Sequence, residues 1–460
     1  MSRLVRSPRA ALRGSHRRLV TGFGRLGRLG WTGLLRHLGF IAGAVCVVSV
    51  DVACNTRLEV LTQDPRSDAG APSRGRRESL DASVDAAPDA RDAGRIEYRD
   101  AQAEAGATLP PFVVASYDET CAAISGAIYC WGAAPDGHTR SLPEPLEGAG
   151  AADFLRITSG ASSHCAERVD GTIWCWGTND HGELGQGDRT ARVAPVRVAL
   201  AGPATGVRGH FDSFCATLDG GGLECWGDNE EGELGQGGTY PGEDVLVPVS
   251  VPGNRDFRVA DVGQGHACGA TATSALWCWG RDSDGELGLP ADASEELRSP
   301  ALVDDSGGWS AVATGQNHTC ALKSGALYCF GANFAGQLGQ GDQQNRSVPT
   351  RVGTDADWVS VDVDTFHSCG IRAPGAMWCW GRNVEGQLGT GDTSDRPSPV
   401  QVGHDVDWVQ VSTGRFHTCA LRADGSIWCT GANDDGRLGT GDLTRRDVMT
   451  RVVIPNANSD

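Results

Sequence analysis

The cysteines of this chain have the spacing that disulfide or metal chemistry requires. The sequence contains 16 cysteines, and all but Cys46 and Cys54 form seven pairs whose members are nine or ten positions apart. The pairs are Cys121 with Cys130, Cys165 with Cys175, Cys215 with Cys225, Cys268 with Cys278, Cys320 with Cys329, Cys369 with Cys379, and Cys419 with Cys429. Two thiols this close can be oxidised to a disulfide or can bind a soft metal ion such as zinc.

The register of a β-hairpin explains the spacing. If Cys419 lies opposite Cys429, a three-residue loop at 423–425 connects the two strands and ends in glycine, as such loops prefer. Where the spacing is nine, the loop shortens to two residues, such as Ser125-Gly126, and the cysteines stay opposite each other. Directly opposed residues have Cα atoms about 4.5 to 5.5 Å apart, which suits a disulfide. We therefore predict seven disulfides within hairpins, which indicates an oxidising compartment.

Zinc binding is the alternative chemistry. Four pairs have a histidine two positions before the first cysteine, where it would share a strand face with that cysteine. These residues are His266, His318, His367 and His417. No C-x-x-C spacing or fourth ligand accompanies them, and serine replaces the histidine at Ser163 and Ser213. We therefore predict no metal, and we expect the histidines to form hydrogen bonds with a neighbouring repeat.

The cysteine pairs mark a repeat of about fifty residues. Their second members recur at spacings of 45, 50, 53, 51, 50 and 50 residues, and a period of this size indicates a repeat architecture. The last repeat predicts strands at 408–411, 417–421 and 426–429, and a fourth strand follows a glycine-rich loop, as at 193–198. Seven four-stranded units predict an all-β, seven-bladed β-propeller, because radial closure removes exposed sheet edges. We expect residues 449–453 to form the last fourth strand and to close the ring near the first unit.

Composition excludes several classes of protein. The chain has 460 residues, 13 tryptophans and a formal net charge of −18. It is too long for a disulfide miniprotein, too apolar for a disordered chain, and too acidic for a non-specific nucleic-acid binder. It contains no G-x-S-x-G, no H-E-x-x-H and no phosphate-binding loop with lysine. Residues 282–286 resemble a calcium loop, but they align with the turn at 433–436 and lack a distal glutamate. These patterns predict a protein that is not an enzyme and has no cofactor.

Three segments divide the chain. Residues 1–54 are typical of an export signal, because nine arginines and no acid precede an apolar stretch of 13 residues that ends shortly before Cys54. Val52-Ala53-Cys54 resembles the end of a bacterial lipoprotein box, so we predict lipidation of Cys54; cleavage nearby and a nucleic-acid-binding arm are the alternatives. Residues 55–110 are rich in Asp and Ala and predict a disordered linker, whereas residues 111–460 form the propeller. We expect an exported protein, either lipid-anchored at the cell envelope or secreted.

The repeats resemble a known family. The string from Cys379-Trp380-Gly381 to Gly386-Gln387-Leu388-Gly389, preceded by His367-Ser368-Cys369, resembles the repeat of the regulator of chromosome condensation family, a seven-bladed propeller. Similar strings begin at Cys175, Cys225, Cys329 and Cys429, and the resemblance covers about residues 111–455. It implies two alternative functions: a guanine-nucleotide exchange factor for a small GTPase, or a secreted enzyme inhibitor. Because the propeller is acidic and carries an export signal, we predict instead a monomeric binding scaffold for a protein or surface ligand.

The third repeat departs from the others. Glu224 stands where other repeats have an aromatic residue before the second cysteine, and an insertion at 238–244 lengthens the following loop. The aromatic residues at that position, which we expect to pack between blades, are Tyr129, Trp174, Trp277, Tyr328, Trp378 and Trp428. Loops on a rigid scaffold are the usual sites of recognition. We therefore predict that Glu224, Tyr240, Glu243 and Asp244 contact a partner.

Overall fold

The structure is a computed structural model that describes residues 109–455, apart from 134–136, 151–152, 239–241, 254 and 291–295. The predicted export segment, its Cys54 and almost all of the predicted linker lie outside the described residues, as does Tyr240. The described residues form 28 β-strands and no helix. Accordingly, this part of the chain has no helix that is long and apolar enough to span a membrane.

Each blade is a continuous run of four strands. Blades 1 to 4 consist of β1 (Phe112–Ala115), β2 (Glu119–Ile124), β3 (Ala127–Ala133), β4 (Thr139–Pro145); β5 (Phe154–Ser159), β6 (Ser163–Arg168), β7 (Ile173–Gly177), β8 (Arg192–Arg197); β9 (Ala204–His210), β10 (Ser213–Leu218), β11 (Leu223–Gly227), β12 (Val245–Ser250); and β13 (Phe257–Val262), β14 (His266–Thr271), β15 (Leu276–Arg281), β16 (Glu296–Asp304). Blades 5 to 7 consist of β17 (Trp309–Thr314), β18 (His318–Lys323), β19 (Ala326–Gly331), β20 (Arg346–Arg351); β21 (Trp358–Val363), β22 (His367–Arg372), β23 (Ala376–Gly381), β24 (Arg396–Gln401); and β25 (Trp408–Thr413), β26 (His417–Arg422), β27 (Ile427–Gly431), β28 (Arg446–Arg451).

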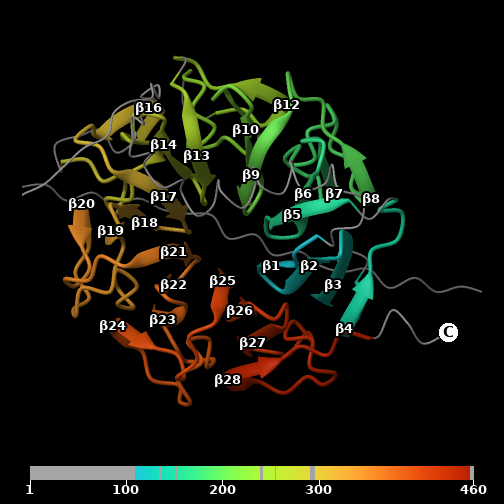
Figure 1. The fold of residues 1–460 in the computed structure, drawn as a ribbon. Coiled ribbons are helices and arrows are strands. Elements are labelled where there is room, and N and C mark those ends of the chain that lie inside the picture. The colour runs from blue at the N-terminus through green and yellow to red at the C-terminus, as the bar shows by residue number, and fades with distance from the viewer. Residues whose placement is uncertain are drawn as a thin grey trace, which may run out of the picture. The chain divides into compact units, whose positions relative to one another are not determined.

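The seven antiparallel sheets form a ring. In every blade the strands lie in sequence order, and the first strand of each blade faces the centre of the ring while the fourth lies at its rim (Figure 1). This arrangement confirms the predicted seven-bladed propeller. It also places the turns after the first strands and the loops after the third strands on one face of the ring, because the strands of a blade alternate in direction.

The predicted hairpin register is confirmed, and with it the seven disulfides. Cys419 lies directly opposite Cys429, and each of the seven pairs forms a disulfide with a Cα–Cα distance of 4.1 Å. In the first blade, Ser125 and Gly126 have φ of 49° and 80° and form the predicted two-residue turn. Each bridge closes a loop of about ten residues. It contributes about 2 to 3 kcal/mol to the free energy of unfolding, because it reduces the conformational entropy of the unfolded chain.

The residue after the second cysteine packs one blade onto the preceding blade. In blade 4 this residue is Trp279, which is completely buried and donates a hydrogen bond from Nε1 to the carbonyl oxygen of Glu233 in blade 3 at 2.7 Å. Gly235 has φ of +68°, and a Cβ atom there would lie 2.7 Å from the Trp279 ring nitrogen, so this close approach requires glycine. The aromatic residues before the second cysteine, such as Trp378, pack at the edge of these inter-blade clusters and stay partly exposed.

The ring closes without exchange of a strand between the last and first blades. The outer strand β28 pairs with β27 of its own blade, which confirms that residues 449–453 include the end of a fourth strand. Val452, just beyond β28, belongs to one hydrophobic cluster with Val113 and Trp131 of blade 1. The Gln410 side chain also bonds both backbone groups of Val113, accepting from N at 3.1 Å and donating to O at 2.6 Å. Together with backbone hydrogen bonds from Arg415 to Ser116 and from Gly441 to Ser141, these side-chain contacts close the ring.

Candidate binding surfaces and buried polar networks

Four buried histidines tie successive blades together. Each histidine begins the second strand of its blade, and its Nε2 lies within hydrogen-bond distance of a hydroxyl on the second strand of the next blade. The pairs are His266 with Thr319 at 2.9 Å, His318 with Ser368 at 2.9 Å, His367 with Thr418 at 2.8 Å, and His417 with Thr120 at 2.8 Å. The expectation that these histidines bond a neighbouring repeat is confirmed. The zinc alternative has no thiolate to use here, because the cysteines beside these histidines are in disulfides.

The direction of these hydrogen bonds indicates which nitrogen of the imidazole ring carries the proton. The Thr319 hydroxyl donates to the Glu286 carbonyl oxygen at 2.9 Å, so its oxygen accepts a hydrogen bond from the Nε2–H of His266. The Nδ1 atoms of all four histidines are buried without a partner. Burial lowers the pKa of each ring, to about 3 for His318 and about 4 for His367. The four imidazoles are therefore neutral, and the rings of His266, His318 and His417, whose hydroxyl partners each donate to a carbonyl oxygen, carry their proton on Nε2.

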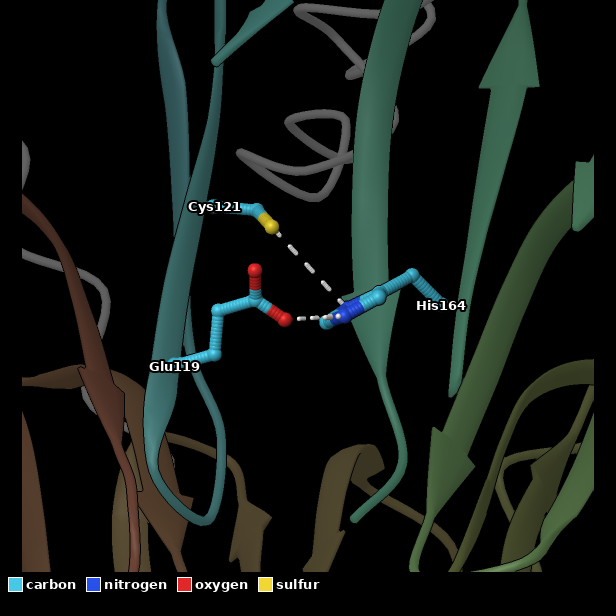
Figure 2. A group of neighbouring side chains, drawn as sticks. All are labelled: Glu119, Cys121 and His164. Atoms are coloured by element: carbon cyan, nitrogen blue, oxygen red, sulfur yellow. Dashed lines mark hydrogen bonds and ion pairs between the residues drawn. The ribbon is translucent and has the colours of Figure 1, made fainter. Parts of the chain in front are cut away.

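Blades 1 and 2 are joined by a different pair at the same positions. Glu119 replaces the histidine of blade 1, and His164 replaces the hydroxyl residue of blade 2 (Figure 2). Their Oε2 and Nε2 atoms lie 2.8 Å apart, and both side chains are buried. The ring Nδ1 lies 2.8 Å from the Ser159 hydroxyl and 4.0 Å from the sulfur of Cys121. This exchange of residue types was not predicted, although it is visible in the sequence when the repeats are aligned by their first cysteines.

This Ser159, His164 and Glu119 arrangement lacks the backbone donors of a serine hydrolase. An acyl-transfer site needs free N–H groups that point at the developing oxyanion. The two N–H groups that follow the serine are already used, because Gly160 donates to the Ser163 carbonyl oxygen at 2.7 Å and Ala161 donates to the Phe211 carbonyl oxygen at 2.8 Å. The arrangement is therefore a structural tie between blades.

The first strands surround a central cavity of about 540 Å³. Its wall includes two partly buried carboxylates, Asp261 and Asp362, that each accept two hydrogen bonds from the next blade. Asp261 accepts from the backbone N and the hydroxyl of Thr314 at 2.7 and 3.1 Å, and Asp362 accepts from the same groups of Thr413 at 2.7 and 2.9 Å. Burial raises the pKa of both carboxyls, to about 6 for Asp362. These residues hold the inner strands in place and add two acidic groups to a wall that also contains many apolar residues.

One ion pair crosses the end of this cavity. His210 at the end of β9 in blade 3 places Nε2 3.1 Å from Oδ2 of Asp364, which follows β21 in blade 6. His210 reaches inward because β9 pairs with β10 up to the His210–Ser213 pair and leaves a two-residue turn, in which Phe211 has φ of 51°. In blade 7 the corresponding pairing stops at Thr413 and Thr418, which leaves a longer turn. Neither residue of this pair belongs to a motif that is recognisable in the sequence.

The residues predicted to bind a partner differ in their burial and in their polar contacts. Glu224 is buried and accepts hydrogen bonds from the Ala201 backbone at 3.1 Å and the Ser250 hydroxyl at 3.3 Å. Asp244 is partly buried and pairs with Arg189 at 2.5 Å and with Nδ1 of His181 at 3.3 Å. Glu243, next to it in the chain, is exposed. The structure therefore places Glu243 and Asp244 on a loop and Glu224 inside the blade.

Side chains with metal-ligating atoms meet in two places among the described residues. One group is Glu119, Cys121 and His164, in which the cysteine is part of a disulfide. The other is His181, Asp228 and Asp244, whose ligand atoms lie within 4.8 Å of one another. The Arg189 guanidinium already neutralises Asp244 in this second group. We therefore assign no metal to either group.

The fold and its repeated inter-blade contacts define a propeller with a disulfide in each blade and a central cavity between the first strands. A family model, the regulator of chromosome condensation (RCC1) repeat, matches residues 170–209, 221–276, 274–322, 324–371 and 374–421, which is more than half of the chain. A second model with the same description matches residues 360–387 and 408–437. The chain belongs to the regulator of chromosome condensation repeat family.

Curated relatives share parts of this chain. The ultraviolet-B receptor UVR8 of Arabidopsis thaliana is 32% identical over 264 residues, which is 53% of this chain and 59% of the receptor. The probable E3 ubiquitin-protein ligase HERC4 of Mus musculus is 40% identical over 185 residues, 39% of this chain and 17% of the ligase. The chain thus spans less than two thirds of these relatives, which are eukaryotic proteins and give no support to the predicted bacterial lipoprotein character.

Solved structures show the same fold at low sequence identity. Human WBSCR16 aligns with a TM-score of 0.61 and 20% identity over 70% of this chain and 87% of its own. Prp20p of Saccharomyces cerevisiae, whose structure was described with its binding to Gsp1p and histones, aligns with a TM-score of 0.62 and 18% identity over 79% of this chain and 90% of its own. These likenesses support the propeller fold alone.

Proposed function

We propose that this chain is an exported, non-enzymatic binding propeller that recognises a protein or surface ligand through the loops of its blades. The observation that carries the proposal is the set of seven intra-hairpin disulfides. Cytosolic thiols are kept reduced, so a fold with a disulfide in every blade indicates an oxidising compartment. An exported location argues against the exchange-factor alternative, which requires a GTPase in the cytosol.

The N-terminal pattern agrees with this location. Lipidation of Cys54 would hold the propeller at the cell envelope, and the Asp- and Ala-rich linker would keep it clear of the membrane. Without lipidation the same chain is secreted. In either case, the loop of blade 3 that carries Tyr240, Glu243 and Asp244 is one proposed contact region, since it is the insertion that distinguishes this blade from the others.

The test is the intact mass of the protein from its native host, after alkylation of free thiols without prior reduction. We expect a mature chain that begins near Cys54, with or without added lipid, and no alkylated cysteine between residues 121 and 429. A chain that retains its N-terminus and has every thiol alkylated would overturn the proposal. Nucleotide-exchange assays with small GTPases would then become the next experiment.

A further inference from the structure

Two arginines on one face of the ring lie on aromatic rings and lack an acidic partner. They belong to a group that we call the arginine–aromatic arc, which lies on the face formed by the turns after the first strands and the loops after the third strands. The arc consists of Tyr117, Phe334, Phe366, Arg382, Arg415 and Phe416. Its residues come from blades 1, 5, 6 and 7, so only the closed ring brings them together.

The contacts within the arc are continuous. The Arg415 guanidinium carbon lies 4.0 Å from the Tyr117 ring centroid and 4.7 Å from that of Phe416. The corresponding atom of Arg382 lies 5.1 Å from the Phe366 centroid and 6.0 Å from that of Phe416. Phe334, which is 54% exposed, meets Phe366 edge-on at 5.7 Å. The two guanidinium groups therefore flank one phenylalanine ring, and cation–π attraction holds them there.

No carboxylate in the described part of the chain pairs with Arg382 or Arg415. Neither guanidinium group has a hydrogen bond or ion pair there, and Nε of Arg415 is buried without a partner. Burial and the neighbouring Arg437 lower the pKa of Arg415, but a guanidinium group stays charged at neutral pH. Each arginine thus keeps unused N–H donors at the edge of an aromatic surface.

At the opposite ends of the second strands, cations that lie over an aromatic ring also have an acidic partner. Four cations there lie over a tryptophan and also pair with an aspartate. Arg168 lies over Trp174 and pairs with Asp153 at 3.2 Å, Lys323 lies over Trp309 and pairs with Asp304 at 2.6 Å, Arg372 lies over Trp378 and pairs with Asp357 at 2.7 Å, and Arg422 lies over Trp428 and pairs with Asp407 at 3.4 Å. Arg382 and Arg415 have the aromatic contact without the carboxylate.

We propose that the arginine–aromatic arc is the docking surface for a carboxylate-bearing segment of a partner protein. This inference rests on the proposed binding function and names the surface and the chemistry of its ligand. The planar guanidinium fork bonds a carboxylate through two parallel N–H groups, and the exposed ring of Phe334 offers apolar contact beside it. Arginine and aromatic residues are also the types that dominate binding energy at protein interfaces. A nucleic acid does not fit, because the net charge of −18 repels a long polyanion.

A short peptide tests the proposal directly. The probe is a fluorescein-labelled Glu-Phe-Glu-Phe-Glu peptide, compared with its Gln-Phe-Gln-Phe-Gln analogue by fluorescence anisotropy on the oxidised, mature chain. We expect the acidic peptide to bind about tenfold more tightly, the effect of one charge-assisted hydrogen bond, and we expect the preference to weaken as salt is raised. The double variant Arg382→Gln/Arg415→Gln should lose this preference.

A matched variant controls for net charge. Arg197→Gln/Arg258→Gln removes two positive charges at exposed positions on β8 and β13, and it should keep the preference for the acidic peptide. Equal binding of both peptides to the unchanged protein, or equal loss in both double variants, would overturn the arc as the docking surface. Self-association that the Arg382→Gln/Arg415→Gln variant abolishes would also overturn it, because a second copy would then be the occupant. None of these results alters the alkylation pattern, which decides the proposed function separately.

Discussion

His210 and Asp364 are 154 positions apart in the sequence, yet their side chains form an ion pair across the end of the central cavity at 3.1 Å. Burial alone would lower the pKa of His210, but the Asp364 carboxylate raises it. Burial alone would raise the pKa of Asp364, but the His210 imidazole and the Thr365 hydroxyl lower it. The pair therefore links blades 3 and 6, which share no sheet, through mutual charge stabilisation.

Separating this pair should lower stability in a defined pH range. Because the pKa of His210 is raised, its contribution is present below its ordinary value of 6.5 and is lost as the pH rises through the higher folded value. Because the pKa of Asp364 is lowered, its contribution is present above 3.8 and is lost as the pH falls through the lower folded value. A double-mutant cycle with His210→Gln and Asp364→Asn should give a coupling energy of about 1 kcal/mol at pH 5.5 and less at pH 9. Equal coupling at both pH values would contradict this.

Removal of a single disulfide should destabilise the ring without changing its shape. The variant Cys419→Ala/Cys429→Ala opens a bridge with a sequence separation of 10 between directly opposed residues. The expected loss in free energy of unfolding is about 2 to 3 kcal/mol, since the unfolded chain regains the entropy of that loop. Urea denaturation followed by tryptophan fluorescence measures it, and far-UV circular dichroism controls for the fold. A loss below the error of the method would indicate that the bridge does not form in solution.

The neutral histidines between blades should make the protein sensitive to acid. Burial lowers the pKa of His367 to about 4, whereas in the unfolded chain it returns to about 6.5. Between these values the unfolded state binds more protons, so the free energy of unfolding falls as the pH falls, by up to about 1.4 kcal/mol per pH unit for each such group. His367→Gln keeps a side-chain amide that can hydrogen-bond the Thr418 hydroxyl and removes the titration. Its stability should therefore fall less steeply than that of the unchanged protein between pH 6.5 and 4.5, as measured from urea midpoints at each pH.

The sequence predicted contacts that are local and repeated. The pairing of Cys419 with Cys429 follows from one hairpin and its turn, and the seven copies confirm one another. The link between His210 and Asp364 was not predictable in this way, because it depends on the diameter of the closed ring and on one shortened turn in blade 3. Glu224 was predicted to bind a partner because it departs from the repeat pattern, but departure alone does not reveal that its side chain is buried.

The pair formed by Glu119, which replaces the repeated histidine, and His164, which replaces the repeated hydroxyl residue, was only partly predictable from the sequence. Both residues occupy positions defined by the repeat, so their types were visible in the sequence. That they bond each other, at 2.8 Å between Nε2 and Oε2, depends on how blade 2 packs against blade 1. The contacts of the arginine–aromatic arc also depend on how the blades pack, since its members come from four blades and meet only in the closed ring.

Replacing Glu233 with glutamine should raise the free energy of unfolding at neutral and alkaline pH. It occupies the same repeat position as Gln337 and Gln387, and like them it accepts a hydrogen bond from the backbone N–H two residues earlier, here Glu231 at 3.1 Å. Burial and the nearby Asp228 raise its pKa to about 8. The folded state therefore holds a proton that the unfolded state releases above about 4.5, so the stability of the unchanged protein falls as the pH rises from 4.5 to 8.

Glu233→Gln removes this loss and should raise the free energy of unfolding by about 1 kcal/mol at pH 8, with little gain at pH 5. Glu286→Gln is the matched control at the same repeat position, because Glu286 pairs with Arg281 at 2.9 Å. Removing that carboxylate leaves the arginine without its acidic partner, so this variant should be less stable than the unchanged protein. Urea denaturation of both variants at pH 5 and pH 8 distinguishes the two effects. If Glu233→Gln did not raise the free energy of unfolding at pH 8, the assignment of a protonated Glu233 would be wrong.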